Sequence, residues 1–497
     1  MQAEGSHRPL SLSFGSKAKF LVLIVLDGDR PDYFGLTPLP YVDALRAAGT
    51  QCTRAVDGIL ETETPAGHTA LATGSTPRRN GNLGFSWALT DNDFSLFSPT
   101  VVRSGAIEHI MESTHVPTLA GLYKARHPRE KVVALSGYKY YAADPLGGPS
   151  ADAIMYFRGL INGGYGPTAI PGHVPLPGVL EAPELTLPTF HLTFGQDDGL
   201  ATKLVLDAFV TMRPHLLFIN YPEFDWPLSR VYGANTNRPK VIALMQRFDA
   251  DLGLIEAAYR RAHILKKTLF VITADHGMAP VWRFVSAALI KKAVMQAGAA
   301  TSVTSYSNGA YIWLRNAAKA GAVARYILAA CAPGIQSVYY LSTVGGRVHY
   351  VQAGGLFADA AANSANLYLL ATLLTGYQPT VVVLARNHAT FASTTTHWKA
   401  DHGGASWESQ HIPLILAGPG IRRGVVVSQP AQLIDVAPTV LNDMGIVPTG
   451  MEGHTLAEAL QQSIVTDQQQ RASEIGQIDP LVNALAAQDR YESSHDP

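Results

Sequence analysis

The stretch Leu269-Phe270-Val271-Ile272-Thr273-Ala274-Asp275-His276-Gly277 decides the fold class of this chain. Its apolar run is typical of a strand buried on both faces of a parallel sheet. A carboxylate and an imidazole follow almost at once. Open α/β sheets bind ligands beyond the carboxyl ends of their strands, so we expect Asp275 and His276 to lie at a ligand site.

Two further apolar runs end in the same way. Phe20 to Leu26 is followed by Asp27, and Leu216 to Ile219 is soon followed by Asp225. An unpaired carboxylate is costly to bury, so strands that each end in one are hard to explain as core packing alone. A metal site where these strand ends meet explains them together.

Helical patterns alternate with the strand runs, which indicates a mostly parallel sheet covered on both faces. The sequence therefore predicts an α/β fold, a three-layer α/β/α sandwich. Between His276 and His402 the pattern changes to short strands with two helical stretches, which indicates an inserted, smaller α+β cap. We expect a core over residues 17–284 and 396–465, a cap over 285–395 and a peripheral C-terminal tail over 466–497. Residues 163–188 are rich in Gly and Pro and predict a surface excursion.

The composition argues against several classes of protein. The 497 residues include 38 basic and 39 acidic ones, a balance that offers no electrostatic footprint for duplex nucleic acid or an anionic membrane. Two cysteines cannot form a disulfide framework. Apolar runs fall short of the roughly 18 residues of a membrane span, and no secretory signal is recognised. We expect a soluble, cytoplasmic protein that does not bind membranes; its oligomeric state stays open.

Residues 64–74 predict a helix with a hydroxyl at its amino end. Thr64 would be the N-cap, Pro65 the first helical residue, and Gly74 the residue after the helix. A hydroxyl there lies among free backbone N–H groups at the positive end of the helix dipole, which favours both an alkoxide and a bound phosphate. The alternative is that Thr64 only caps the helix.

Five motifs occur in an order and spacing that are specific when taken together. They are Val25-Leu26-Asp27-Gly28, Thr64-Pro65-Ala66-Gly67-His68, Tyr221-Pro222-Glu223-Phe224-Asp225, Ala274-Asp275-His276-Gly277-Met278 and Asp401-His402-Gly403-Gly404. On these residues the chain resembles the alkaline phosphatase superfamily over nearly its whole length. The resemblance is nearest to the nucleotide pyrophosphatase/phosphodiesterase branch.

The resemblance implies two divalent metal ions that clamp a phosphoryl group beside a threonine nucleophile. The residues that match the family's metal ligands are, for the first ion, Asp27, Thr64, Asp275 and His276, and, for the second, Asp225 and His402. Zinc is the expected metal, with manganese or iron as alternatives, since all three accept mixed carboxylate and imidazole ligands. In the implied reaction Thr64 attacks phosphorus, a phospho-threonine forms, and water releases it.

The expected function is hydrolysis of a small phosphate ester. A phosphodiester or pyrophosphate bond is favoured because the resemblance is nearest to that branch, with a phosphomonoesterase or a phosphonate hydrolase as alternatives. A sulfatase is disfavoured, because Thr64 cannot be converted to formylglycine. The alternative from another class is a metal- or partner-binding protein that has lost turnover.

Two departures from the family pattern suggest that alternative. Relatives carry a metal-binding His four residues after the third-motif Asp, and this chain has Ser229 there. A serine hydroxyl is a poorer ligand than imidazole, so the second ion should bind more weakly or use His411, His397 or a water. Arg230 could hold a phosphate oxygen at this place, or it could be a surface arginine.

The second departure is Phe85, which stands where relatives have an Asn that touches a phosphate oxygen. Asn82 and Asn80 are therefore candidates for substrate binding. Lys139 is a further candidate, because it follows a strand and could point a cation into the site, although a solvated loop lysine is favoured. His68 lies one helical turn from Thr64, where a structural role is favoured over a catalytic one.

Overall fold

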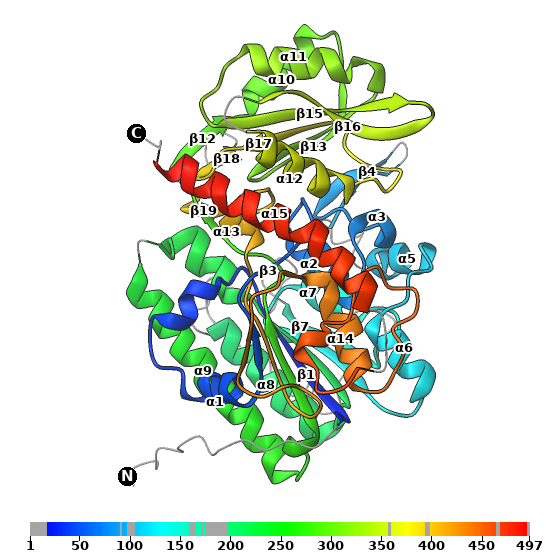
Figure 1. Ribbon diagram of the computed structural model, residues 1–497, viewed down its shortest axis with the longest axis vertical. Helices are drawn as coiled ribbons and strands as arrows, with labels where there is room; N and C mark the ends of the chain where they lie inside the picture. The colour runs from blue at the N-terminus through cyan, green and yellow to red at the C-terminus, as the bar shows by residue number, and fades with distance from the viewer. Residues whose placement is uncertain are drawn as a thin grey trace.

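The computed structural model describes residues 17–89, 92–96, 105–158, 166–169, 173, 196–235, 237–355, 359–392, 398–463 and 468–494. Most of the excursion predicted over residues 163–188 therefore lies outside the described residues. Two parts stack along the long axis of the molecule. The larger contains β1 (Phe20–Leu26), and the smaller contains β15 (Ile335–Val344) (Figure 1).

The larger part is built on a mostly parallel sheet. Within the described residues it has nine strands, in the order β21-β2-β20-β10-β1-β9-β6-β7-β8. At its centre β1 runs parallel to both of its neighbours, β10 (Thr268–Thr273) and β9 (Leu216–Tyr221). The other strands are β2 (Thr50–Cys52), β6 (Val132–Ser136), β7 (Ala153–Arg158), β8 (Gly166–Ala169), β20 (Leu414–Ala417) and β21 (Val425–Val427). Of these, β8 and β20 run antiparallel to the strands beside them.

Helices cover both faces of this sheet, because successive residues of β1 point to opposite sides. Val22 and Ile24 belong to one buried cluster and Leu21 and Leu23 to the other. The first cluster includes side chains of α1 (Pro40–Ala48), α8 (Gln196–Thr211) and α9 (Arg238–Arg261). The second includes side chains of α2 (Thr64–Thr73), α6 (Leu119–Arg126), α7 (Tyr140–Gly147) and α14 (Val436–Asp443). The predicted three-layer α/β/α sandwich is confirmed.

The helix that carries Thr64 differs from the prediction by one position at its amino end. Glu63 is the N-cap, and Thr64 is the first residue of α2. Pro65 tolerates this shift, because the N–H that proline lacks would be unpaired anywhere in the first turn. Gly74 ends the helix in the left-handed conformation, with φ 55°, as predicted.

The smaller part has an antiparallel sheet in the order β13-β14-β17-β15-β16. Its strands besides β15 are β13 (Thr301–Tyr306), β14 (Gly309–Leu314), β16 (Arg347–Gly355) and β17 (Val381–Ala385). One face packs on α10 (Ala287–Gln296) and α11 (Ala320–Ala329). The other face packs with α12 (Ala360–Ala371) and α15 (Gln468–Ser494). This α+β unit falls within the segment expected to form the cap.

The segment expected to be a peripheral tail forms α15, which crosses the junction of the two parts (Figure 1). Although α15 is polar overall, one of its faces is apolar. On this face Ile478, Leu481 and Leu485 are buried against side chains of α12. Ion pairs and hydrogen bonds tie it to both parts. Arg54 Nη1 lies 2.6 Å from Asp479 Oδ1, and Gln336 Nε2 donates to Glu492 Oε1 at 3.0 Å.

Among the helices of the described residues, none combines the length and the apolar character needed to span a bilayer.

Candidate active site

Three adjacent strands deliver the predicted ligands to one edge of the sheet. Asp27 follows β1, Asp275 and His276 follow β10, and Asp225 comes shortly after β9. Because these strands are parallel, their carboxyl ends lie together. The backbone N–H of Gly28 donates to Asp275 Oδ1 at 3.2 Å, which links the ends of β1 and β10 directly.

A short antiparallel pair brings His402 to the same edge. β11 (Ala279–Pro280) pairs with β19 (Ala400–Asp401), so the chain returns from the cap beside the end of β10. The His402 ring then stacks on the His276 ring, with centroids 3.8 Å apart. Two motifs separated by the whole cap are thus in contact.

The Thr64 hydroxyl lies among these groups. Thr64 is fully buried, and its Oγ1 is 3.4 Å from His276 Nε2 and 3.5 Å from Lys139 Nζ. Gly67 lets α2 pack this closely, because a Cβ at Gly67 would lie only 2.4 Å from the Asp275 carbonyl oxygen. The packing of α2 on the end of β10 therefore fixes the position of the hydroxyl.

Two carboxylates and an imidazole lone pair converge beside Thr64. His276 Nδ1 lies 2.9 Å from the Gly277 carbonyl oxygen, which assigns the proton to Nδ1 and leaves Nε2 as an acceptor. Nε2 lies 3.4 Å from Asp275 Oδ2 and 3.8 Å from Asp27 Oδ1. Burial, followed by the charge of Asp275, raises the pKa of Asp27. Such converging acceptors repel one another unless a cation lies between them.

His68 completes a candidate metal site in which ligand atoms of Asp27, His68 and Asp275 all lie within 4.8 Å of one another. Both nitrogens of His68 are nevertheless engaged. Nδ1 donates to the Thr64 carbonyl oxygen at 2.8 Å, and Nε2 accepts from Asn220 Nδ2 at 3.1 Å. The buried Asp275 Oδ2 has no well-formed hydrogen bond, although His68 Nδ1 is 3.3 Å away. These contacts suit a structural role for His68 and leave Asp275 available to a cation.

Lys139 is buried in the centre of the site rather than solvated. It is 1% exposed, and its Nζ donates to Asp27 Oδ1 at 2.7 Å and to Asp225 Oδ2 at 2.5 Å. Burial alone would lower the pKa of Lys139, but the charges of Asp225 and Asp27 outweigh it and raise the pKa well above its ordinary value. Lys139 is therefore a fixed cation beside the Thr64 hydroxyl.

Arg230 is the second cation of the site. It lies in η4 (Asp225–Tyr232), where its Nε donates to Asp225 Oδ1 at 2.9 Å and its Nη1 lies 3.0 Å from Asp401 Oδ1. Its Nη2 donates to His402 Nε2, because Nδ1 of that ring donates to the Thr62 carbonyl oxygen at 2.7 Å. The sequence analysis does not predict a site role for Asp401, although its position directly before His402 indicates that it lies near the site.

The ionisation of His402 and Asp225 follows from these neighbours. Burial, followed by the nearby His276 ring and the charge of Arg230, holds the pKa of His402 well below its ordinary value. Burial would raise the pKa of Asp225, but the charges of Lys139 and Arg230 hold it well below its ordinary value. At neutral pH His402 is uncharged and Asp225 is an anion.

Ser229 stands where the resemblance implies a metal-binding His, and its side chain is engaged elsewhere. Its hydroxyl donates to the Phe224 carbonyl oxygen at 2.6 Å. Of the suggested substitutes, His411 has its Nε2 3.0 Å from the Thr53 carbonyl oxygen and its ring stacked on Trp407. His397 lies outside the described residues.

Asn80 and Asn82 are not brought into contact with Thr64 Oγ1 or the two cations by any described interaction. Asn82 Nδ2 donates to Thr69 Oγ1 at 2.8 Å, and Asn80 Nδ2 donates to the Ser75 carbonyl oxygen at 2.7 Å. Both amides thus hold the segment around α2 and α3 (Pro77–Asn80). The backbone N–H of Phe85 donates to Glu63 Oε2 at 2.7 Å.

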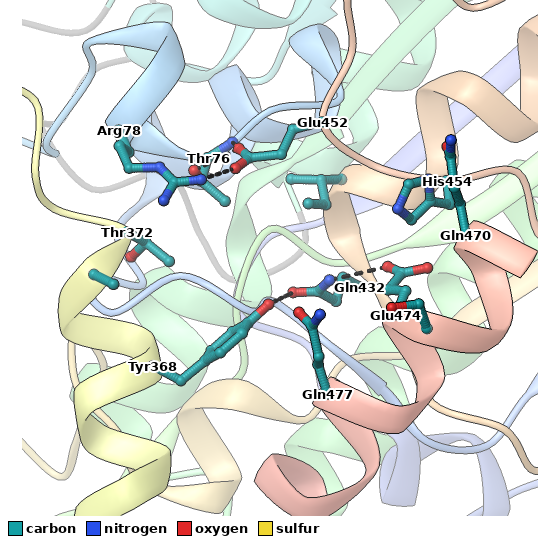
Figure 2. A pocket seen from close by; sticks show the side chains of 13 residues that line it. Thr76, Arg78, Tyr368, Thr372, Gln432, Glu452, His454, Gln470, Glu474 and Gln477 are labelled. Atoms are coloured by element: carbon teal, nitrogen blue, oxygen red, sulfur yellow. Dashed lines mark hydrogen bonds and ion pairs between the residues drawn. The ribbon is translucent and has the colours of Figure 1, made fainter.

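A separate cavity of about 420 Å³ opens beyond the other end of α2 (Figure 2). Thr76 and Arg78 line one side, where both contact Glu452, and Tyr368 of α12 and Glu474 of α15 line the opposite side. The ten residues of α2 separate it from Thr64 by about 15 Å of helix. Its lining contains none of the residues predicted for the site.

Comparisons with solved structures show the fold. Murine ectonucleotide pyrophosphatase/phosphodiesterase 5 in complex with AMP is 14% identical, with a TM-score of 0.61, over 89% of this chain and 100% of that one. Alkaline phosphatase PafA is 16% identical, with a TM-score of 0.65, over 90% of this chain and 100% of that one.

The matches to curated proteins are shorter. Arylsulfatase K of Danio rerio is 34% identical over 15% of this chain and 17% of that protein. Alkaline phosphatase PhoK of a Sphingomonas species is 30% identical over 28% of this chain and 27% of that protein. These alignments thus span well under a third of either relative.

The family profile decides the assignment, because it covers most of the chain. The profile of type I phosphodiesterase / nucleotide pyrophosphatase matches residues 21–403, which include every candidate site residue except the suggested substitute ligand His411. This range begins in β1 and ends just after His402. The chain belongs to the type I phosphodiesterase / nucleotide pyrophosphatase family.

Proposed function

We propose that this protein is a metal-dependent hydrolase of phosphoric esters in which Thr64 is the nucleophile. One observation carries the proposal: the buried Thr64 hydroxyl is within 3.5 Å of both His276 Nε2 and Lys139 Nζ, at the amino end of α2. A helix amino end favours an alkoxide and a phosphate. A threonine that only capped the helix would not require a buried lysine beside its hydroxyl.

The residues at the end of β1 and β10 fit a divalent metal ion. Asp27, Asp275 and His276 offer two carboxylates and a neutral imidazole, and the Thr64 hydroxyl is a fourth ligand. The Asp275 oxygen without a well-formed hydrogen bond supports this assignment. When bound, the ion supplies a Lewis acid that lowers the pKa of the hydroxyl and neutralises charge on the phosphoryl oxygens. Zinc is proposed, because it commonly binds Asp through oxygen and His through nitrogen.

The reaction proposed for these residues has two displacements at phosphorus. Thr64 Oγ1 loses its proton and forms a bond to phosphorus, while the ester bond breaks and the leaving alcohol takes up a proton. A water oxygen then attacks the phospho-threonine, the bond to Oγ1 breaks, and Thr64 regains a proton. Lys139 stays protonated throughout and stabilises negative charge on Oγ1 and on the phosphoryl group.

The substrate we propose contains a phosphodiester or pyrophosphate bond, which is the class named by the family profile. A phosphomonoester is the second candidate, and the two fixed cations, Lys139 and Arg230, favour it, because a monoester carries one more negative charge than a diester. Arg230 has a planar group that suits two phosphoryl oxygens. Asn80 and Asn82 are weaker candidates for substrate contacts, since their amides are already engaged.

The test is hydrolysis of bis(p-nitrophenyl) phosphate and p-nitrophenyl phosphate by the zinc-loaded protein and by Thr64→Ala. Removing a nucleophile should lower kcat by roughly a thousandfold or more. Thr73→Ala is the matched control, because it removes another fully buried hydroxyl from the same helix. If the unaltered protein and Thr64→Ala were equally inert on a broad panel of phosphate esters, the metal- or partner-binding alternative would replace this proposal.

A further inference from the structure

The atoms that would bind the family's second metal ion are already occupied by cationic side chains. The second ion is expected to bind Asp225 and His402. Both oxygens of Asp225 accept hydrogen bonds, one from Arg230 and one from Lys139. The one nitrogen of His402 that can accept is engaged by Arg230. A metal ion here would have to displace the guanidinium from Asp225 Oδ1 and His402 Nε2 and the Lys139 ammonium from Asp225 Oδ2, so these residues do not fit a second ion. At the first site Lys139 holds only one carboxylate oxygen, Asp27 Oδ1, and Asp275 Oδ2 has no well-formed hydrogen bond.

The guanidinium is held in this place by more than its carboxylate partners. The Arg230 carbonyl oxygen accepts from the Lys399 N–H at 2.9 Å, which fixes η4 against β19. The guanidinium carbon lies 5.6 Å from the centre of the Trp398 ring, a cation–π contact. The Arg230 side chain is 17% exposed. It is thus anchored in the site by its backbone, by a ring and by two carboxylates.

The charges of the site also disfavour a second divalent ion. Lys139 and Arg230 already offset negative charge on Asp27, Asp225 and Asp401. A divalent ion at Asp225 and His402 would lie directly beside these two cations, which is costly in a buried site until an anion enters.

We propose that Arg230 replaces the second metal ion, so that this protein binds a single divalent ion at Asp27, Thr64, Asp275 and His276. The inference rests on the proposed function only for its catalytic consequence. Arg230 and Lys139 then bind the phosphoryl oxygens in the half of the site where relatives are expected to hold a metal. Relative to the family pattern, this chain has lost the metal-binding His at position 229 and has Arg230 beside it. We interpret the two differences together: the guanidinium supplies the positive charge that the second metal ion would supply.

The exchange predicts which half-reaction is slow. A guanidinium stabilises phosphoryl oxygens, but it cannot lower the pKa of a bound water as a metal ion does. Transfer of the phosphoryl group to Thr64 should remain fast, while attack of water on the phospho-threonine should be slow. The leaving alcohol should therefore appear in a burst of about one equivalent per chain.

The decisive experiment counts bound metal and does not depend on turnover. The metal-free protein is titrated with Zn²⁺ and, separately, with Mn²⁺ by calorimetry in the presence of a weak competing chelator. The expected stoichiometry is one ion per chain. Two ions bound with similar affinity, or no ion at all, would overturn the proposal.

Two matched substitutions locate the ion. Asp275→Asn should abolish tight binding, whereas Asp225→Asn should leave the stoichiometry at one, because Asp225 serves the cations and not the metal. A two-metal site would lose one ion in each variant. The double variant Ser229→His with Arg230→Gly restores the family ligand and removes the guanidinium, so it should bind two ions. If it bound one while keeping the circular dichroism spectrum of the unaltered protein, the replacement idea would be wrong.

The two proposals fail in different ways. Two bound ions together with a Thr64-dependent esterase activity would reject the single-ion site and keep the proposed function. One bound ion without activity on any ester would keep the single-ion site and reject the proposed function. A burst of leaving alcohol that is lost in Thr64→Ala, together with one bound ion, supports both.

Discussion

Replacing Lys139 by methionine tests how much the buried cation contributes to folding. Its Nζ lies 2.7 Å from Asp27 Oδ1, and both side chains are almost fully buried. The same Nζ forms a second ion pair with Asp225. Removing one partner of a buried ion pair leaves an uncompensated charge and costs about 3–5 kcal/mol. The metal-free Lys139→Met protein should therefore lose about 3–5 kcal/mol of unfolding free energy at neutral pH.

Lys203→Met is the matched control for that experiment. Lys203 Nζ also lies 2.7 Å from a carboxylate, that of Asp207, but the two side chains are 52% and 35% exposed. A solvent-exposed helical pair of this kind contributes about 0.3–0.5 kcal/mol. Urea unfolding followed by circular dichroism gives both values. Equal losses in the two variants would refute the reasoning, because distance and not burial would then set the energy.

The remaining predictions concern pH and backbone packing. Burial raises the pKa of Asp443 to about 7, so the folded protein binds more protons than the unfolded one between about pH 4 and 7, and its stability falls as pH rises through that window. The advantage of Asp443→Asn in unfolding free energy, measured by urea unfolding, should grow over this window and level off above it, at no more than about 4 kcal/mol; an advantage independent of pH would contradict this. Gly67→Ala should cost about 1–3 kcal/mol and weaken Zn²⁺ binding, because its Cβ would collide with Asp275. Gly476→Ala in α15, whose Cβ would meet nothing within 4 Å, should leave Zn²⁺ binding unchanged and raise the thermal midpoint slightly; equal Zn²⁺ affinities in both glycine variants would contradict the packing argument.

The strands and the residues at their ends could be predicted from the sequence because their pattern is local. A run such as Phe20 to Leu26 is apolar throughout because the strand is buried on both faces. The composition of the run is therefore enough to predict a buried strand. The position of Asp27 follows from the end of the run. Strand direction is different: β20 is an apolar run like the others, yet it lies antiparallel to β10, which depends on the path of the whole chain.

The partners of the two cations could not be predicted, because they depend on contacts between distant segments. Lys139 pairs with carboxylates 112 and 86 positions away, and Arg230 with a histidine 172 positions away. A lysine in a loop with Gly and Tyr neighbours has the composition of a solvated segment, which is why burial was not favoured. Arg230 could be suspected from its place beside Ser229, but whether it faced solvent or His402 required the fold.

The position of α15 in the sequence has a consequence for how the molecule is made. This helix comes after every strand of both sheets, yet it pairs with Arg54 of the larger part and Gln336 of the smaller one. During translation the two parts can therefore fold before α15, which contacts both of them, emerges from the ribosome. A nascent chain that stalls before residue 468 would already contain every residue proposed for the active site, but it would lack the helix that joins the two parts.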